Sequence, residues 1–283
     1  MTAPGHDALD AALATVHRWP VANVAATVLV AGQRAASIGD ERRSFRLASV
    51  SKLLTAYAVL IAVEEGVVAL DDTVGQPGCT VRHLLAHAGG YAFDGPDAIA
   101  VPGRKRIYSN TGYELLADHV AAACGFEFAV YVREAVLDPL GMADTDPSGS
   151  PAKDFRGPLG DLGGFVAELV TPTLVDPATW AEATSPQFPE LEGIVPGVGR
   201  FSPCPWGLGP ELRGLKHPHW TGNNNSPATF GHFGGAGTFI WVDPVAGVAL
   251  AMLADREFDE WALHAWPDFS DGVLDAAGAR GHR

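Results

Sequence analysis

Apolar residues in the first quarter of the chain change from a strand-like to a helix-like spacing. Residues 24–30 are apolar, and after Gly32 a second such run covers 35–38, which predicts a β-hairpin. From Ser49 onward, apolar residues recur at intervals of three and four, which predicts an amphipathic helix capped by that serine. The apolar positions of this helix are Val50, Leu53, Leu54, Tyr57, Ala58 and Ile61.

Strand patterns return near the other end of the chain. Residues 239–242 and 248–253 are apolar and flank a turn that contains proline and glycine, so they predict a second hairpin. We expect the segment around His232 to form the strand before it. Residues 258–279 have a helical pattern, which Pro267 is expected to interrupt.

The middle of the chain has helical patterns separated by loops rich in proline and glycine. We therefore predict an α/β (α+β) fold, in which helices flank an antiparallel sheet and an all-α subdomain is inserted. Residues 1–71 and 201–283 would form the α/β domain from both chain ends, and residues 72–200 the helical insertion. The proline-rich segment 184–205 is expected to form an irregular wall of a cleft between them.

Composition narrows the partners. The 283 residues are 47 % hydrophobic and 18 % charged, which is typical of a globular protein with a large core. The net charge of −14 argues against nucleic acid and anionic membranes as partners. The first residues do not resemble a signal peptide, and no apolar run is long enough to span a membrane. The chain has an odd number of cysteines, Cys79, Cys124 and Cys204, which is typical of reduced thiols rather than of a disulfide framework. We therefore expect a cytoplasmic protein, and its oligomeric state stays open.

Ser49 and Lys52 give the start of the predicted helix its candidate chemistry. Residues three apart share a helix face, so the hydroxyl of Ser49 and the amine of Lys52 can meet. A lysine against apolar surface loses solvation of its charged form, which lowers its pKa and makes the neutral amine available as a base. The N–H groups of the first helical turn lack intrahelical partners and would face an oxyanion formed at Ser49.

The same spacing also has a structural explanation. Serine is a common helix N-cap, and a Ser-x-x-Lys match arises by chance about once in a chain of this length. Ser150 and Lys153 provide such a match in a segment rich in proline and glycine, where no helix would hold the two side chains together. However, the chain has only four lysines, and arginine, its usual cation, cannot act as a base. A lysine at position 52 therefore favours catalysis.

Two further segments complete a recognisable set. Residues 107–113, IYSNTGY, contain the triplet Tyr108-x-Asn110, and residues 231–237, GHFGGAG, contain a His-x-Gly triplet. In order and spacing, the three motifs resemble those of the serine β-lactamase and penicillin-binding-protein superfamily. The similarity is to the branch of class C β-lactamases, D-alanyl-D-alanine carboxypeptidases, D-aminopeptidases and family VIII carboxylesterases. Residues 80–90 and 139–145 also resemble family segments, so the resemblance covers nearly the whole chain.

The resemblance implies catalytic roles for three residues. Ser49 would be the acyl-accepting nucleophile, Lys52 its base or proton partner, and Tyr108 the relay that passes the proton to the leaving group. A phenol beside a cationic lysine is expected to have a lowered pKa. The active site would lie between the two predicted parts of the chain, and the resemblance implies neither a cofactor nor a metal.

The resemblance also implies substrate-binding roles. Asn110 would contact the substrate and orient Lys52, and the glycine-rich strand end with Gly234 and Gly235 would line the site. The backbone N–H groups of Ser49 and Gly235 would form the oxyanion hole. His232 occupies the position where β-lactamases usually have lysine.

Departures from the β-lactamase pattern shape the functional prediction. His232 is mostly neutral at pH 7, which weakens the positive charge that a β-lactam carboxylate would meet, and protonation toward pH 6 would restore part of it. Phe233 replaces a common threonine and removes a donor. We therefore favour a serine hydrolase that acts through an acyl-enzyme on a small ester or amide, esterase-like or D-amino-acid amidase/peptidase-like. A β-lactamase, a biosynthetic acyltransferase of the same fold and a non-catalytic binding module are the alternatives.

Other histidines have simpler explanations. His83 and His87 have the i, i+4 spacing of a metal pair, but no third ligand is evident, so we expect them to pack a helix. The segment 217–220, HPHW, is expected to be a solvated loop.

Overall fold

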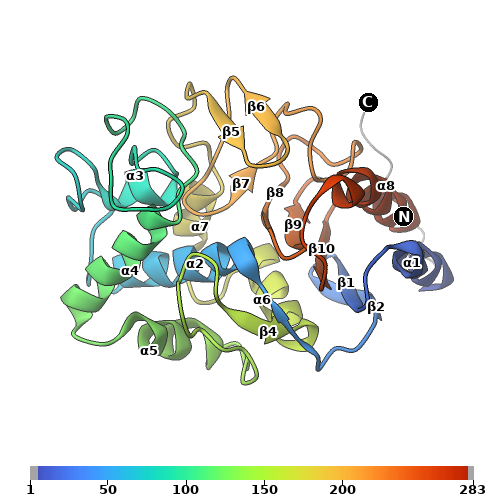
Figure 1. The fold of residues 1–283 in the computed structure, drawn as a ribbon. Helices are drawn as coiled ribbons and strands as arrows, with labels where there is room; N and C mark the ends of the chain where they lie inside the picture. The colour runs from blue at the N-terminus through green and yellow to red at the C-terminus, as the bar shows by residue number, and fades with distance from the viewer. Residues whose placement is uncertain (1–5, 280–283) are drawn as a thin grey trace.

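The structure, a computed structural model, describes residues 6–279. Residues 1–5, on which the signal-peptide prediction partly rests, lie outside the described residues. A six-stranded sheet has the order β2-β1-β10-β9-β8-β7 with antiparallel pairing (Figure 1). Both predicted hairpins and the expected strand at His232 are confirmed. The strands are β1 (Val24–Val30), β2 (Gln33–Ile38), β7 (Glu211–Leu212), β8 (Phe230–Gly234), β9 (Thr238–Asp243) and β10 (Val248–Ala254).

The centre of the sheet joins the two ends of the chain. Strand β1 pairs with β10 from Val24 opposite Ala254 to Val30 opposite Val248. All seven residues of β10 are buried because helices cover both faces of the sheet. Helix α6 (Leu159–Val170) packs on β1, β9 and β10 on one face. Figure 1 shows α1 (His6–Leu13) and α8 (Glu260–Ala276) together on the other side.

Helix α8 runs through Pro267 without a break, so the predicted interruption was wrong. Proline lacks one N–H and removes one hydrogen bond of the helix. Burial against the sheet compensates for this loss, since Trp266 on one side of the proline and Phe269 on the other are both buried. Asp259 caps the N-terminus by accepting from the N–H of Trp261.

The remaining helices gather on the α6 side of the sheet (Figure 1). They are α2 (Ser51–Glu64), α3 (Val81–Leu85), α4 (Thr111–Cys124), α5 (Phe128–Val132), which continues as a π-turn over Arg133–Leu137, and α7 (Pro177–Ala183). Short strands pair as β3 (Ser44–Arg46) with β4 (Arg156–Pro158) and β5 (Gly193–Val195) with β6 (Gly199–Phe201). The predicted α/β (α+β) fold is therefore correct, and the boundaries at 72 and 200 stay a prediction.

Helix α2 is the central helix of this half. Every residue from Ser51 to Ala62 is buried, so the expected amphipathic pattern with one solvent face was wrong. The helix is enclosed because α4, α5 and strand β8 all pack against it. A helix without a polar face is typical of a helix buried on all sides. The amine of Lys52 is therefore buried together with the apolar side chains of α2.

Within residues 6–279, no single helix is long and apolar enough to cross a membrane. One bent pair, formed by α4 with the helical stretch 128–137, passes that test on length and composition, with a bend of 86°.

Candidate active site

Ser49 lies in a single 3-10 turn, Ala48–Val50, directly before α2. The helix begins at Ser51 with Val50 at the cap position and no side-chain cap bond, so the prediction that Ser49 caps the helix was wrong. Ala48 has φ +47°, in the left-handed region that disfavours residues with a side chain. The turn is held through Leu47, whose N–H donates to the Phe155 carbonyl (2.9 Å) and whose carbonyl accepts from Thr238 Oγ1 (2.9 Å). The half-buried hydroxyl of Ser49 is therefore not used in capping.

The two glycines after His232 have different surroundings. A Cβ on Gly234 would lie 2.4 Å from the Leu47 carbonyl oxygen, so only glycine lets the end of β8 lie against the Ser49 turn. Gly235 is exposed, and a Cβ there would find its nearest neighbour 3.9 Å away, at Glu257. Gly234 thus allows β8 to pack closely against the Ala48–Val50 turn, while Gly235 faces open space.

Lys52 is completely buried, and its amine has neutral partners. Nζ donates to Asn110 Oδ1 (2.6 Å) and to the Ala152 carbonyl (2.9 Å). Burial lowers the pKa of Lys52 to about 7, and the more distant carboxylate of Asp94 acts in the opposite direction. The predicted fall in the lysine pKa therefore agrees with the structure. Asn110 Nδ2 donates to Asp94 Oδ1 (3.0 Å), which keeps the amide oxygen turned toward the lysine.

Tyr108 lies between the turn of Ser49 and strand β8. Its ring centroid is 4.7 Å from Lys52 Nζ, and its hydroxyl lies 3.3 Å from His232 Nε2. Burial raises the pKa of Tyr108 far above its usual value, although the side chain of Ser49 acts in the opposite direction. The expected fall of this pKa was wrong, because loss of solvation outweighs a lysine that is itself close to neutral. Tyr108 is therefore a neutral phenol.

His232 faces Tyr108 with its unprotonated nitrogen. Nδ1 lies 2.7 Å from the Phe233 carbonyl, so Nδ1 carries the proton and Nε2 accepts from the tyrosine hydroxyl. Burial lowers the pKa of His232 to about 4, and the charge of Lys52 adds to this. The expectation that pH 6 would protonate this ring was therefore wrong, because the ring has no solvent to stabilise its charge.

The structure adds contacts that sequence reasoning missed. The Ala152 carbonyl that holds Lys52 comes from the second Ser-x-x-Lys match, and no sequence signal could identify it because any residue has a carbonyl. Within that match, Ser150 Oγ donates to Glu114 (2.9 Å), and Lys153 lies 3.4 Å from Asp94. Ser150 and Lys153 therefore have other partners, as the loop context predicts.

A pocket of about 280 Å³ opens beside Tyr108. Its apolar walls include Phe93, Ile107 and Ile194. Three cationic residues and one carboxylate also line it: Lys105, Arg106, Arg200 and Glu192. The segment 184–205 supplies one side, as predicted for a cleft wall, but it is partly regular because it contains the β5–β6 hairpin. The volume is near the lower limit for a small-molecule site.

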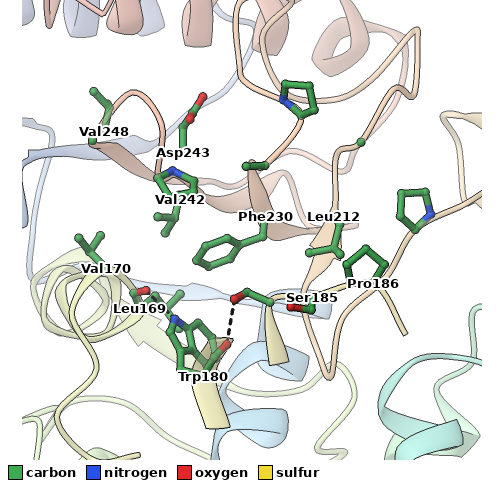
Figure 2. A pocket seen from close by; sticks show the side chains of 17 residues that line it. Leu169, Val170, Trp180, Ser185, Pro186, Leu212, Phe230, Val242, Asp243 and Val248 are labelled. Carbon is green, nitrogen blue, oxygen red and sulfur yellow. Dashed lines mark hydrogen bonds between the residues drawn. The ribbon is translucent and has the colours of Figure 1, made fainter. Parts of the chain in front are cut away.

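A larger pocket of about 640 Å³ lies elsewhere and contains none of the candidate residues. Figure 2 shows Phe230 and Trp180 among its mainly apolar side chains. Its polar groups already have partners, since Ser185 Oγ donates to the Ala181 carbonyl (2.6 Å) and Asp243 accepts from Ser226 (2.7 Å). Its lining therefore offers no nucleophile with a base. Of the candidate catalytic residues, Tyr108 lines the smaller pocket, so the candidate active site is placed by the contacts among Lys52, Tyr108, Asn110 and His232, with the smaller pocket beside them.

Within residues 6–279 no three metal-binding side chains gather, and His83 and His87 pack against aromatic rings. His83 stacks on Phe188 at 4.6 Å, and His87 packs on Tyr108 at 4.4 Å. The prediction of a solvated loop at 217–220 was wrong for His219 and Trp220, because both side chains are buried. Each donates a hydrogen bond to the carboxylate of Glu211.

Comparison with known proteins agrees with this arrangement. The family described as Beta-lactamase matches residues 11–270. The chain belongs to the beta-lactamase family. The resemblance to the serine β-lactamase and penicillin-binding-protein superfamily is thereby confirmed, and membership carries the fold but not a particular substrate.

Individual beta-lactamase relatives differ in what they share with the chain. A crystal structure described as a beta-lactamase from Mycobacterium bovis is 48 % identical, with a TM-score of 0.93, over 94 % of this chain and 99 % of that one. EstCE1, described as a hydrolase with promiscuous acyltransferase activity, shares the fold at 17 % identity and TM-score 0.75, over 95 % and 98 %. Penicillin-binding protein 4* of Bacillus subtilis is 33 % identical over 36 % of this chain and 30 % of its own length, so this match covers about a third of each protein.

Proposed function

We propose that the chain is a serine hydrolase that forms an acyl-enzyme with a small ester or amide. The observation that carries the proposal is the buried amine of Lys52, one helical turn from Ser49, with neutral hydrogen-bond partners and a pKa of about 7. An amine with this pKa is half neutral at neutral pH, where a general base is most effective. No such lysine is needed for a helix cap.

The reaction needs only residues of this chain. As Ser49 Oγ attacks the carbonyl carbon, Lys52 Nζ takes its proton, and the N–H groups of Ser49 and Gly235 stabilise the oxyanion. Tyr108 gives its proton to the leaving group as the bond to the carbonyl carbon breaks, and Lys52 returns a proton to Tyr108. In the second half, water attacks the acyl-enzyme by the same route and releases the acid and Ser49.

The volume of the pocket and the neutral ring of His232 support a small ester or amide as the substrate. The pocket beside Tyr108 has about 280 Å³, and burial holds His232 neutral. A neutral ring supplies no fixed charge for a β-lactam carboxylate, which favours esters or amides. β-Lactam hydrolysis is the second candidate because of the 48 % identity to the Mycobacterium bovis structure described as a beta-lactamase. Transfer of the acyl group to an alcohol would use the same acyl-enzyme, as the description of EstCE1 suggests.

The test labels the nucleophile and measures turnover of p-nitrophenyl butyrate. A fluorophosphonate should add to the intact protein at Ser49, and Ser49→Ala should lower turnover by about three orders of magnitude or more. Ser150→Ala is the matched control and should leave turnover unchanged. Full turnover by the Ser49→Ala variant would overturn the proposal, and absence of both adduct and turnover would favour the binding module.

A further inference from the structure

His87 has an unusual backbone and environment for a residue that belongs to none of the catalytic motifs. It follows α3 with φ +53°, in the left-handed region that bulky residues avoid, and it is only 2 % exposed. Such a conformation persists only where surrounding contacts determine it. The contacts of His87 therefore indicate what the strain maintains.

Those contacts hold the segment of Tyr108 from both sides. The carbonyl of His87 accepts from the N–H of Ile107 (2.8 Å), and its Nδ1 accepts from the N–H of Ser109 (3.2 Å). Between them, the imidazole ring packs on the ring of Tyr108, with centroids 4.4 Å apart and planes at 41°. On another side, Trp206 meets the imidazole edge-on at 5.0 Å. One residue thus fixes both neighbours and the ring of the tyrosine.

We propose that His87 is a positioning residue for proton transfer by Tyr108. It holds the phenol so that the hydroxyl lies between Ser49 and His232 Nε2. A misplacement of about 1 Å can lower a rate about a hundredfold, so positioning of this kind affects kcat. The inference rests on the proposed function and adds a residue to it.

The tautomer of His87 supports a role for its acceptor nitrogen. Because Nδ1 accepts a hydrogen bond, Nε2 must carry the proton, yet among residues 6–279 the buried Nε2 has no partner. A buried donor without a partner destabilises the fold, a cost that an apolar ring would avoid. Burial, and then the charge of Lys52, hold the pKa of His87 well below its usual value, so the ring stays neutral.

Two substitutions separate the acceptor from the ring. Asparagine places an amide oxygen close to the position of Nδ1 and tolerates a left-handed backbone. Phenylalanine keeps an aromatic ring against Tyr108 but leaves the Ser109 N–H without its acceptor. If His87 works by fixing this segment, His87→Asn should retain more activity than His87→Phe.

The experiment is a double-mutant cycle on p-nitrophenyl butyrate with Tyr108→Phe. We expect His87→Phe to lower kcat about tenfold to a hundredfold with KM changed less than about twofold, and His87→Asn to restore much of that loss. In the Tyr108→Phe background, either His87 substitution should change kcat less than about twofold, because the hydroxyl it positions is gone. His83→Asn, whose ring packs on Phe188, is the control and should leave kcat unchanged.

Three results would overturn the inference: a wild-type kcat for His87→Phe, equal kcat for the two His87 variants, or effects that multiply with Tyr108→Phe. If His87→Phe does not fold, His87→Gly takes its place in the same cycle, because glycine suits the left-handed backbone and removes both the ring and the acceptor nitrogen. Failure of the proposed function is a separate result, because Ser49→Ala and Tyr108→Phe would then leave turnover intact.

Discussion

Two buried lysines of this chain have opposite surroundings. Lys52 donates only to neutral oxygen atoms, those of Asn110 and Ala152. The amine of Lys216 lies 2.7 Å from Glu211 Oε1 and also donates to the Pro205 carbonyl (3.1 Å). Both lysines have 3 % or less of their surface exposed, so burial alone does not distinguish them.

The difference in partners explains why burial lowers the pKa of Lys52. Burial alone would raise the pKa of Glu211, but the charges of Lys216 and His219 lower it far below its usual value. Glu211 is therefore a carboxylate, and it compensates the charge of Lys216 inside the protein. Lys52 has no such compensation at hydrogen-bond distance, so it is the lysine that gives up its proton. Lys216 thus has a carboxylate partner, whereas Lys52 has an amide in its place.

Replacing each lysine by arginine should give the largest difference between the two positions. Lys52→Arg should lower kcat for p-nitrophenyl butyrate about a thousandfold or more, because arginine keeps the charge but cannot act as a base. Lys216→Arg should keep kcat within a few-fold and lower only stability. Circular dichroism should show that both variants are folded. A nearly wild-type kcat for Lys52→Arg would show that another group activates Ser49.

Removing the carboxylate of Glu211 tests whether it stabilises the buried charge of Lys216. Glu211→Gln should lower the free energy of unfolding by about 3–5 kcal/mol, because it leaves the charge of Lys216 buried without its partner. Chemical denaturation measures this effect. Glu211→Gln combined with Lys216→Met should regain much of the loss, since no charge then remains to compensate. Equal stability of Glu211→Gln and the wild type would show that water already solvates Lys216.

The pKa of Lys52 makes stability depend on pH. Its folded value of about 7 lies below the ordinary 10.5, so between these values the unfolded chain binds more protons and stability rises with pH. Relative to Lys52→Met, the wild type should gain roughly 3 kcal/mol in the free energy of unfolding between pH 7 and pH 10. A difference between wild type and Lys52→Met that stays constant with pH would mean that the lysine remains charged in the fold.

The smallest expected effect concerns His232. Because its pKa is about 4, lowering the pH from 8 to 6 should leave the ratio of nitrocefin to p-nitrophenyl butyrate turnover unchanged within about twofold. Both rates should fall together as Lys52 takes up a proton. A ratio that shifts toward nitrocefin at pH 6 would show that His232 titrates near neutrality.

Sequence patterns predict the fold because strand alternation and turn residues are local. The pairing of β9 with β10 follows from two apolar runs around one turn. The motif residues Lys52, Tyr108, Asn110 and His232 also lie together, although they are far apart in sequence.

Electrostatic properties could not be predicted in the same way. The pKa of Tyr108 depends on how completely distant segments bury it, and adjacent residues do not encode this. Likewise, Glu211 has Lys216 and His219 as partners because the loop after β7 folds back on it, and the sequence pattern does not indicate this loop conformation. Local patterns therefore give the positions of the groups but not their protonation states.

The pairing of β1 with β10 has a consequence for the synthesis of the protein on the ribosome. Ser49, Lys52 and Tyr108 emerge well before His232 and the partner strand of β1. Until Ala254 leaves the ribosome, the apolar edge of β1 lacks its native neighbour, and nascent chains of this kind are prone to aggregate. The growing polypeptide thus carries Ser49 and Lys52 for about 200 residues of translation without the strand that pairs with β1. The candidate site is complete only after β8 and β10 have emerged, and during this interval chaperones can act on β1.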